Sequence, residues 1–139
     1  MTTAFVDAEG IVKDWLTSLS DLVGVGNPIP QGIHLIRLRS PYTSAWAQLS
    51  VVGGDDDWIP DGGAHRARVS ASIYGATRLG ANTAAVAYAN ALRRIPITRP
   101  VVDGVRLATV AAMTGPLYIP DGDDERYLVD ADVYLIPTP

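Results

Sequence analysis

Acidic side chains gather in two short stretches of the sequence, and clustered carboxylates have a well-defined chemistry. The stretches are "DDDWIPDGG" (55–63) and "PDGDDE" (120–125), and they hold eight of the fifteen acids. Carboxylate oxygens are the ligands that Mg²⁺ and Ca²⁺ prefer, but neither stretch has the twelve-residue EF-hand pattern with its terminal Glu. Solvated loop ends are therefore the favoured interpretation, and a metal-dependent hydrolase is kept as an alternative.

A second carboxylate pair stands on one face of a predicted strand near the end of the sequence. Asp130 and Asp132 are two residues apart, which places them about 7 Å from each other in a strand. General acid–base catalysis needs such a pair to be buried and perturbed. Arg66 and Arg68 occupy the matching strand of a repeated segment. We therefore favour Arg–Asp pairing, across the sheet or across a subunit contact, over catalysis.

Residues for nucleophilic or nucleotide chemistry are sparse. His34 and His65 are the only histidines, and the sequence has no cysteine and no G-x-S-x-G elbow. The glycine-rich "GVGNP" (24–28) follows a predicted helix instead of a strand, so it lacks the context of a phosphate-binding loop. We expect no catalytic, cofactor-binding or metal-binding residue, and no enzyme.

Composition is typical of a single folded domain covering residues 1–139. Hydrophobic residues make up 47% of the chain and charged residues 19%, so a substantial core can form. The net charge of −4, without any basic run, disfavours phosphate binding, which depends on Lys and Arg displacing counterions. The first ten residues lack the basic start and apolar centre of a signal peptide. We expect a soluble protein that is neither secreted nor membrane-bound.

Hydrophobic periodicity predicts the elements that position these side chains. An apolar stripe with Asp7 as N-cap predicts a first helix that ends near Ser20. A second helix is expected over 77–94, and Asp103-Gly104 is a strong signal for a two-residue hairpin turn. Alternating or apolar runs predict strands at 33–39, 45–52, 66–74, 105–113 and 127–135, with the first two joined near Ser40-Pro41.

These elements predict an α+β fold. We expect a mostly antiparallel sheet with two helices packed on one face, in the order α-β-β-β-α-β-β, with long hairpin tips. Parallel neighbours would need crossover connections, and most of the predicted connections are too short for them.

The two acidic stretches belong to a longer repeat. Residues 58–74 and 118–134 align without a gap and share "IPDG", which is turn chemistry followed by a strand. Each copy is predicted to be the tip and return strand of a hairpin, and both tips are expected at one end of the sheet. The helix ends and the turn "RSPYTS" (39–44) are expected at the other. The matching tip residues Trp58-Ile59 and Tyr118-Ile119 suggest contacts outside the domain.

The order of the predicted elements and the residue patterns of several stretches resemble a known family. The stretches that carry the resemblance are "FVDAEGIVKDWL" (5–16), "GNPIPQGIHLIRLRSP" (26–41), "RVSASIYGATRLGANTAAVAYANAL" (68–92) and "TGPLYIPDGDDERYLVDADVYLIP" (114–137). Together they resemble the tail terminator, or tail completion, proteins of long-tailed (siphovirus-type) bacteriophages. The resemblance spans nearly the full length, although no single motif in it is diagnostic.

This resemblance implies a structural role in the virion, at the head-proximal end of the tail. Members are small α+β subunits that form a six-membered ring, stop polymerisation of the tail tube and offer a docking surface to the head connector. The implied partners are other copies of the chain, the major tail tube protein and the head–tail connector or neck protein. DNA would pass through the ring without specific binding, and no membrane or cofactor is implied. A head-completion or neck subunit is the alternative reading within the same setting.

Two sets of residues follow from this reading. The expected interface residues are Trp58, Ile59, Tyr118, Ile119, Arg66, Arg68, Asp130 and Asp132. The acids that are candidates for facing the lumen of the ring are Asp55, Asp56, Asp57, Asp123 and Asp124.

Overall fold

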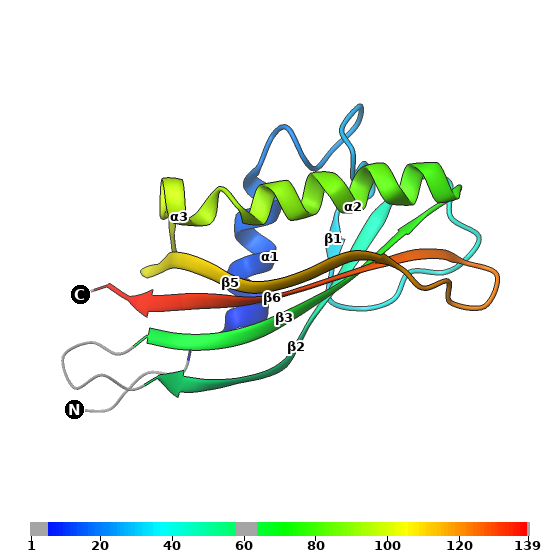
Figure 1. Ribbon diagram of the computed structural model, residues 1–139. Helices are drawn as coiled ribbons and strands as arrows, with labels where there is room; N and C mark the ends of the chain where they lie inside the picture. The colour runs from blue at the N-terminus through cyan, green and yellow to red at the C-terminus, as the bar shows by residue number, and fades with distance from the viewer. Residues whose placement is uncertain (1–5, 58–63, 139) are drawn as a thin grey trace.

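A computed structural model describes residues 6–57 and 64–138 of the chain. It is an α+β structure in which the described residues form a curled, six-stranded mixed sheet together with helices (Figure 1). In chain order the elements are α1 (Ala8–Ser18), β1 (Ile33–His34), β2 (Trp46–Asp57), β3 (Ala64–Gly75), α2 (Arg78–Leu92), α3 (Ile95–Thr98), β4 (Val101–Val102), β5 (Val105–Tyr118) and β6 (Glu125–Pro137).

The strand order of the sheet is β1-β2-β3-β6-β5-β4. Every neighbouring pair is antiparallel except β1 and β2, which are parallel. The predicted α+β class and mostly antiparallel sheet are therefore confirmed. The predicted element order was wrong in detail, because a short helix α3 and a two-residue strand β4 follow α2.

The segment 33–39 departs most from its predicted structure. Only Ile33 and His34 form a strand, paired in parallel with Ala47 and Gln48, and residues 35–39 lie outside the sheet. Parallel neighbours cannot be joined by a tight turn, so the chain must leave the sheet and return before β2 begins. The side chain of Arg37 contacts the turn between β5 and β6, which accounts for the path of this loop.

The two repeated hairpins point in opposite directions. Their return strands, β3 and β6, are antiparallel neighbours, with His65 opposite Leu135 and Gly75 opposite Glu125. The β2–β3 connection therefore lies at one end of the sheet, which we call the β2–β3 end, and the β5–β6 turn lies at the other, the β5–β6 end. The expectation that both tips share one end was wrong. The "RSPYTS" turn lies at the β5–β6 end, where Ser40 contacts Asp124.

Local signals in the sequence account for most of the remaining elements. Asp7 caps α1 by accepting from the Gly10 amide, and Thr77 caps α2 by accepting from the Gly80 amide. Asp103 and Gly104 both have positive φ, 49° and 75°, as the predicted hairpin between β4 and β5 requires.

The core is a single main cluster that includes buried residues of α1, α2 and the strands. Its β6 members are at alternate positions and fully buried: Val129, Ala131, Val133 and Leu135. Alanines on α2 let the helix lie close to the strands it contacts, β3, β6 and β5. A Cβ at Gly75 would come within 2.6 Å of the Ala81 amide nitrogen, so the turn from β3 into α2 requires glycine there. Among the described residues, no helix has the length and apolar character needed to cross a membrane.

Candidate assembly surfaces

The acids of the β5–β6 turn are bound by an arginine from a distant loop. The Arg37 guanidinium lies 2.6 Å from an Asp121 oxygen and 2.6 Å from an Asp124 oxygen, and the Ser40 hydroxyl donates to Asp124 at 2.8 Å. The Tyr74 hydroxyl also donates to Asp121, at 3.2 Å. We call Arg37, Ser40, Tyr74, Asp121 and Asp124 the tip cluster.

Aromatic side chains pack against Tyr74 of the tip cluster. Trp46, which is fully buried, stacks on Tyr74 with ring centroids 4.8 Å apart, and Tyr42 packs against both rings. The Arg37 guanidinium lies 5.2 Å from the Tyr74 ring centre. Hydrogen bonds to Tyr42 and Asp124 raise the pKa of Arg37, so this side chain remains cationic. The loop that carries Arg37 is thus attached to the sheet by both apolar and ionic contacts.

Tyr118, one of the predicted interface residues, is engaged within the chain. Its hydroxyl donates to Glu125 at 2.6 Å, its ring packs against Tyr127, and the Arg78 guanidinium lies 3.8 Å from its centre. The hydrogen bond to Glu125 raises the pKa of Tyr118, because the bond favours the protonated phenol. Ile119 next to it is 39% exposed.

The predicted Arg–Asp pairing across the sheet is present between β3 and β6. Arg68 and Asp132 are Cα partners, and their side chains approach to 3.3 Å. Arg68 also donates to the Ala112 carbonyl of β5 at 2.9 Å, so one side chain connects three strands. One carboxylate oxygen of Asp130 is buried and has no hydrogen-bond partner in the described part of the chain. Arg66 stands opposite Tyr134 in the same ladder.

Both edges of the sheet lack a neighbouring strand over long stretches of the described residues. On β2, strand β1 pairs only with Ala47 and Gln48, and Glu9 of α1 accepts from the Val51 amide. On β5, strand β4 pairs only with Val105 and Arg106. The remainder of each edge has no neighbouring strand within the described residues: 52–57 on β2 and 108–118 on β5.

The two edges differ in charge. The sequence from Leu107 to Pro120 has no charged residue, and the segment before it, 93–106, carries four arginines and a single acid. The free part of β2 ends in the acids 55–57. A groove of about 270 Å³ runs beside β5, between residues 110–113 and the residues Arg93 and Pro96 at the end of α2 and the start of α3.

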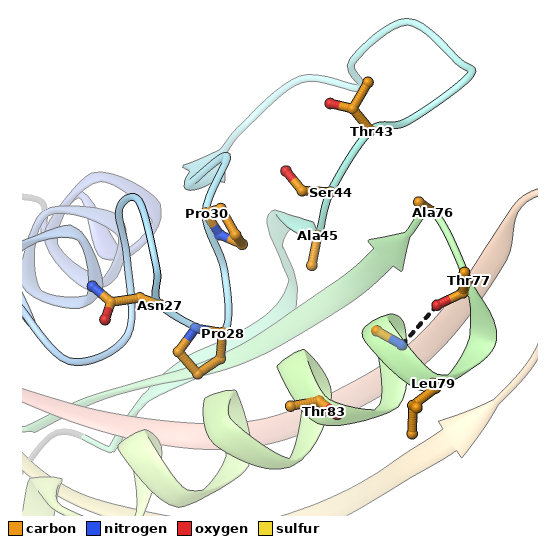
Figure 2. Close-up of a pocket in the computed structure, with 11 residues that line it drawn as sticks. Asn27, Pro28, Pro30, Thr43, Ser44, Ala45, Ala76, Thr77, Leu79 and Thr83 are labelled. Carbon is orange, nitrogen blue, oxygen red and sulfur yellow. Dashed lines mark hydrogen bonds between the residues drawn. The ribbon is translucent and has the colours of Figure 1, made fainter.

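A larger hollow of about 480 Å³ opens beside the start of α2 (Figure 2). No charged side chain lines it, and three of its polar side chains are engaged within the chain. Thr77 accepts from the Gly80 amide, Asn27 donates to the carbonyls of Ser20 and Val23, and Thr43 accepts from Gln31. Its lining includes no His, Asp, Glu, Lys or Arg side chain.

The remaining predicted residues have the following positions. Asp55, Asp56 and Asp57 lie in β2 at the β2–β3 end, opposite Arg66, His65 and Ala64. Asp123 is exposed in the β5–β6 turn, whereas the Asp124 side chain is only 15% exposed. Trp58 and Ile59 lie outside the described residues. Within 6–57 and 64–138, no group of three or more His, Asp or Glu side chains is placed to hold a metal ion.

Arg37 and its loop were missed by sequence reasoning, which placed Arg37 inside a strand. The signal available was weak: the turn residues Ser40 and Pro41 follow closely, and acids stand far away in the sequence. The partners of Arg37 are 84 and 87 residues distant, and no local pattern identifies such a pair.

Comparison with known proteins gives no direct assignment, since no protein-family model and no curated protein matches the chain.

Proposed function

We propose that this chain is a structural subunit of the phage tail terminator type. Copies of it would form a closed ring of six on the head-proximal end of a tail tube, stop the tube from growing and offer a docking surface to the head connector. The proposal rests on the sequence resemblance together with one structural observation: the two ends of the sheet are built differently.

A tail tube grows by adding identical rings, so each new top surface copies the one below it. Growth stops only if the last ring matches the tube on one face and differs on the other. At the β5–β6 end, Asp121 and Asp124 share the Arg37 guanidinium, and Arg126 lies 3.8 Å from Asp121. At the β2–β3 end, β2 finishes in three consecutive acids, 55–57. A ring whose axis runs along the strands would thus have two chemically different faces.

The proposal includes a layered arrangement in which α1 and α2 cover the same face of the sheet. This is supported by the single core cluster that α1 and α2 share with alternate residues of β3 and β6. The opposite sheet face carries polar side chains, among them Arg68 and Asp132, and is available for contacts in the particle.

The proposed partners are the tail tube protein on one face and the connector or neck protein on the other. DNA would pass through the lumen without specific contacts, because an acidic lumen repels phosphates. Asp123 is the candidate lumen acid, whereas Asp55, Asp56 and Asp57 end the free edge of β2, where a neighbouring copy can bind. Asp124 fits this role less well, because its carboxylate is bound by Arg37 and Ser40.

Deletion of the gene from a phage genome tests the proposal. Electron micrographs are expected to show heads and tubes that are not joined, with tubes of uncontrolled length, and supplying the wild-type gene in trans should restore whole particles. Tubes of normal length without heads would instead favour a neck subunit. Normal-length tails firmly attached to heads would contradict both readings.

A further inference from the structure

The two uncovered sheet edges run in directions that allow one copy of the chain to continue the sheet of the next. Three antiparallel steps separate β2 from β5, by way of β3 and β6, so β2 and β5 run in opposite directions. Rotation about a ring axis that lies along the strands keeps each strand direction. The β2 edge of one copy would then meet the β5 edge of its neighbour as an antiparallel pair.

The ladder registers place complementary residues at the same level on the two edges. One row of Cα partners runs from Asp56 through His65 and Leu135 to Leu107. Leu107 directly follows Arg106, which donates to the Arg99 carbonyl. The acids that end β2 are therefore level with the arginines that precede the free part of β5.

We propose that copies of this chain join head to tail, with residues 52–57 of β2 in one copy pairing antiparallel with residues 108–112 of β5 in the next. The inference rests on the proposed function, because it specifies the contact that would close the ring. A heterologous contact of this kind joins two different surfaces. Successive copies form a ring when the rotation from one copy to the next closes after a whole number of copies.

Charge and shape both favour a second copy as the occupant of the β5 edge. An uncharged, exposed edge strand is a template for strand pairing, which natural proteins usually block with charges. On β5 the nearest charges are arginines, and the strand they would attract is the acidic end of β2. The groove beside residues 110–113 provides space for side chains of the added strand, with Arg93 on its wall.

The irregularities of β5 set the length of the contact. Its ladder with β6 shifts register between Ala111 and Thr114 and again between Thr114 and Leu117, and Ala112 has a positive φ of 50°. Bulges of this kind end regular pairing at a strand edge, and Pro116 has no amide hydrogen to donate. The same ladder also shifts register between Leu107 and Thr109, so the part of this edge in continuous register with β6 is Thr109 to Ala111, and the contact is expected to be short.

Disulfide trapping tests the contact directly, because the chain has no cysteine of its own. Gly53 and Ala111 are exposed and belong to one row, through Arg68 and Asp132. Within one copy they are three strands apart, roughly 14 Å, and a disulfide requires Cα atoms within about 7 Å. The double variant Gly53→Cys/Ala111→Cys can therefore form a bond only between copies.

The purified full-length double variant should be concentrated until sedimentation shows association and then oxidised. A non-reducing gel is expected to show a ladder of covalent oligomers that ends at the closed ring. Each single variant should give dimers at most. The matched control Gly53→Cys/Leu117→Cys keeps the β2 cysteine and moves its partner along β5, so it should give no ladder.

Three outcomes would overturn the inference: association without a ladder from the Gly53/Ala111 pair, a ladder from the Leu117 control alone, or a chain that stays monomeric at every concentration. The contact and the proposed function can fail separately. A ladder together with normal tails in the deletion phage would keep the contact and reject the function. Unjoined heads and long tubes without a ladder would keep the function and reject the contact.

A charge variant gives a second, independent test. Replacing Asp55, Asp56 and Asp57 by Asn is expected to weaken association roughly tenfold at low salt, because the substitution removes the charge that the arginines before the free part of β5 would attract. The loss should shrink at high salt. Asp123→Asn, an exposed acid at the β5–β6 end, is the matched control and should leave association unchanged. An unchanged association constant in the triple variant would contradict the pairing.

Discussion

The β5–β6 end and the β2–β3 end of the sheet both carry clustered acids beside a copy of the "IPDG" motif, and they differ in which other segments reach them. At the β5–β6 end, Arg37 crosses from a distant loop, binds Asp121 and Asp124, and rests on a buried aromatic group. At the β2–β3 end, the acids 55–57 extend the β2 strand itself, in register with β3. Asp121 and Asp124 are thus bound within the chain, and residues 55–57 form the end of a sheet edge.

The comparison shows that a repeated turn motif does not fix a repeated function. The motif "IPDG" specifies how the chain turns, whereas the fate of the neighbouring acids depends on what else reaches that end of the sheet. Residues 35–45 lead to only one end, because β1 pairs with the beginning of β2 and not with its acidic end. The asymmetry of the sheet therefore originates in the loop after β1.

Substitutions in the core between the two ends should reduce the stability of the fold more than any others. Val129 is fully buried in β6, so Val129→Asp would bury a charge with no partner and destabilise the fold by about 4 kcal/mol or more. Thermal melts followed by circular dichroism should show loss of the folded state. Val25→Asp, at a fully exposed position, is the control and should melt like the wild type.

Removal of the aromatic support should destabilise the β5–β6 end selectively. Trp46→Ala deletes a buried ring that stacks on Tyr74, at an expected cost of about 3–5 kcal/mol. Leu117→Ala, at a 57% exposed position near the same end, should cost little by comparison. Denaturant unfolding measures both. Equal losses for the two variants would show that the aromatic group does not hold this end together.

The ionic part of the tip cluster should contribute less than its aromatic part. Arg37→Ala removes two ion pairs, but the Arg37 side chain is 45% exposed and water screens these contacts, so we expect a loss of about 1 kcal/mol. Arg37→Lys should recover only part of it, because lysine cannot bind two carboxylates with a planar fork. The expected loss should decrease in high salt.

The same variant sharpens the comparison of the two ends. Arg37→Ala removes the cation that Asp121 and Asp124 share, so the β5–β6 end would become more acidic by one charge. If the difference between the two ring faces controls docking, fewer tails should be joined to heads when the particles are assembled with Arg37→Ala. This decrease should be larger than the loss of subunit stability alone would cause. Counting joined and unjoined tails in micrographs measures this. Unchanged joining would mean that the tip cluster has only a structural role.

The smallest effect is expected from an exposed ion pair that joins the turn after α1 to the end of α2. The hydrogen bond from Arg94 lowers the pKa of Asp21 below its ordinary value of 3.8. A folded-state pKa below the unfolded one contributes stability above that value, and this contribution is lost as the pH falls through the folded pKa. Asp21→Asn should therefore reduce the melting temperature slightly at pH 7 and make its decline below about pH 4 shallower. Equal acid-side slopes for variant and wild type would contradict the assignment.

Sequence reasoning succeeded where the controlling interaction was local. The cap at Asp7, the hairpin at Asp103-Gly104 and the alternating burial of β6 depend on residues a few positions apart. These local signals were sufficient to establish the α+β class.

Non-local partners explain what the sequence did not reveal. The apolar run at 33–39 has the pattern of a strand, but its central residue Arg37 binds acids more than eighty positions away. The placement of the two tips at one end failed because it required knowing that β3 and β6 are antiparallel neighbours. Strand order is a property of the assembled sheet, and single hairpins carry no signal for it.

A reconstruction of the junction between head and tail in a phage that carries this gene tests the central claim most directly. The account predicts a closed ring of six copies between the tube and the connector, with the β2–β3 ends of all subunits on one face and the β5–β6 ends on the other. Density for a different protein at that layer would contradict the account. So would a ring of this chain in which the same sheet end contacts both the tube and the connector.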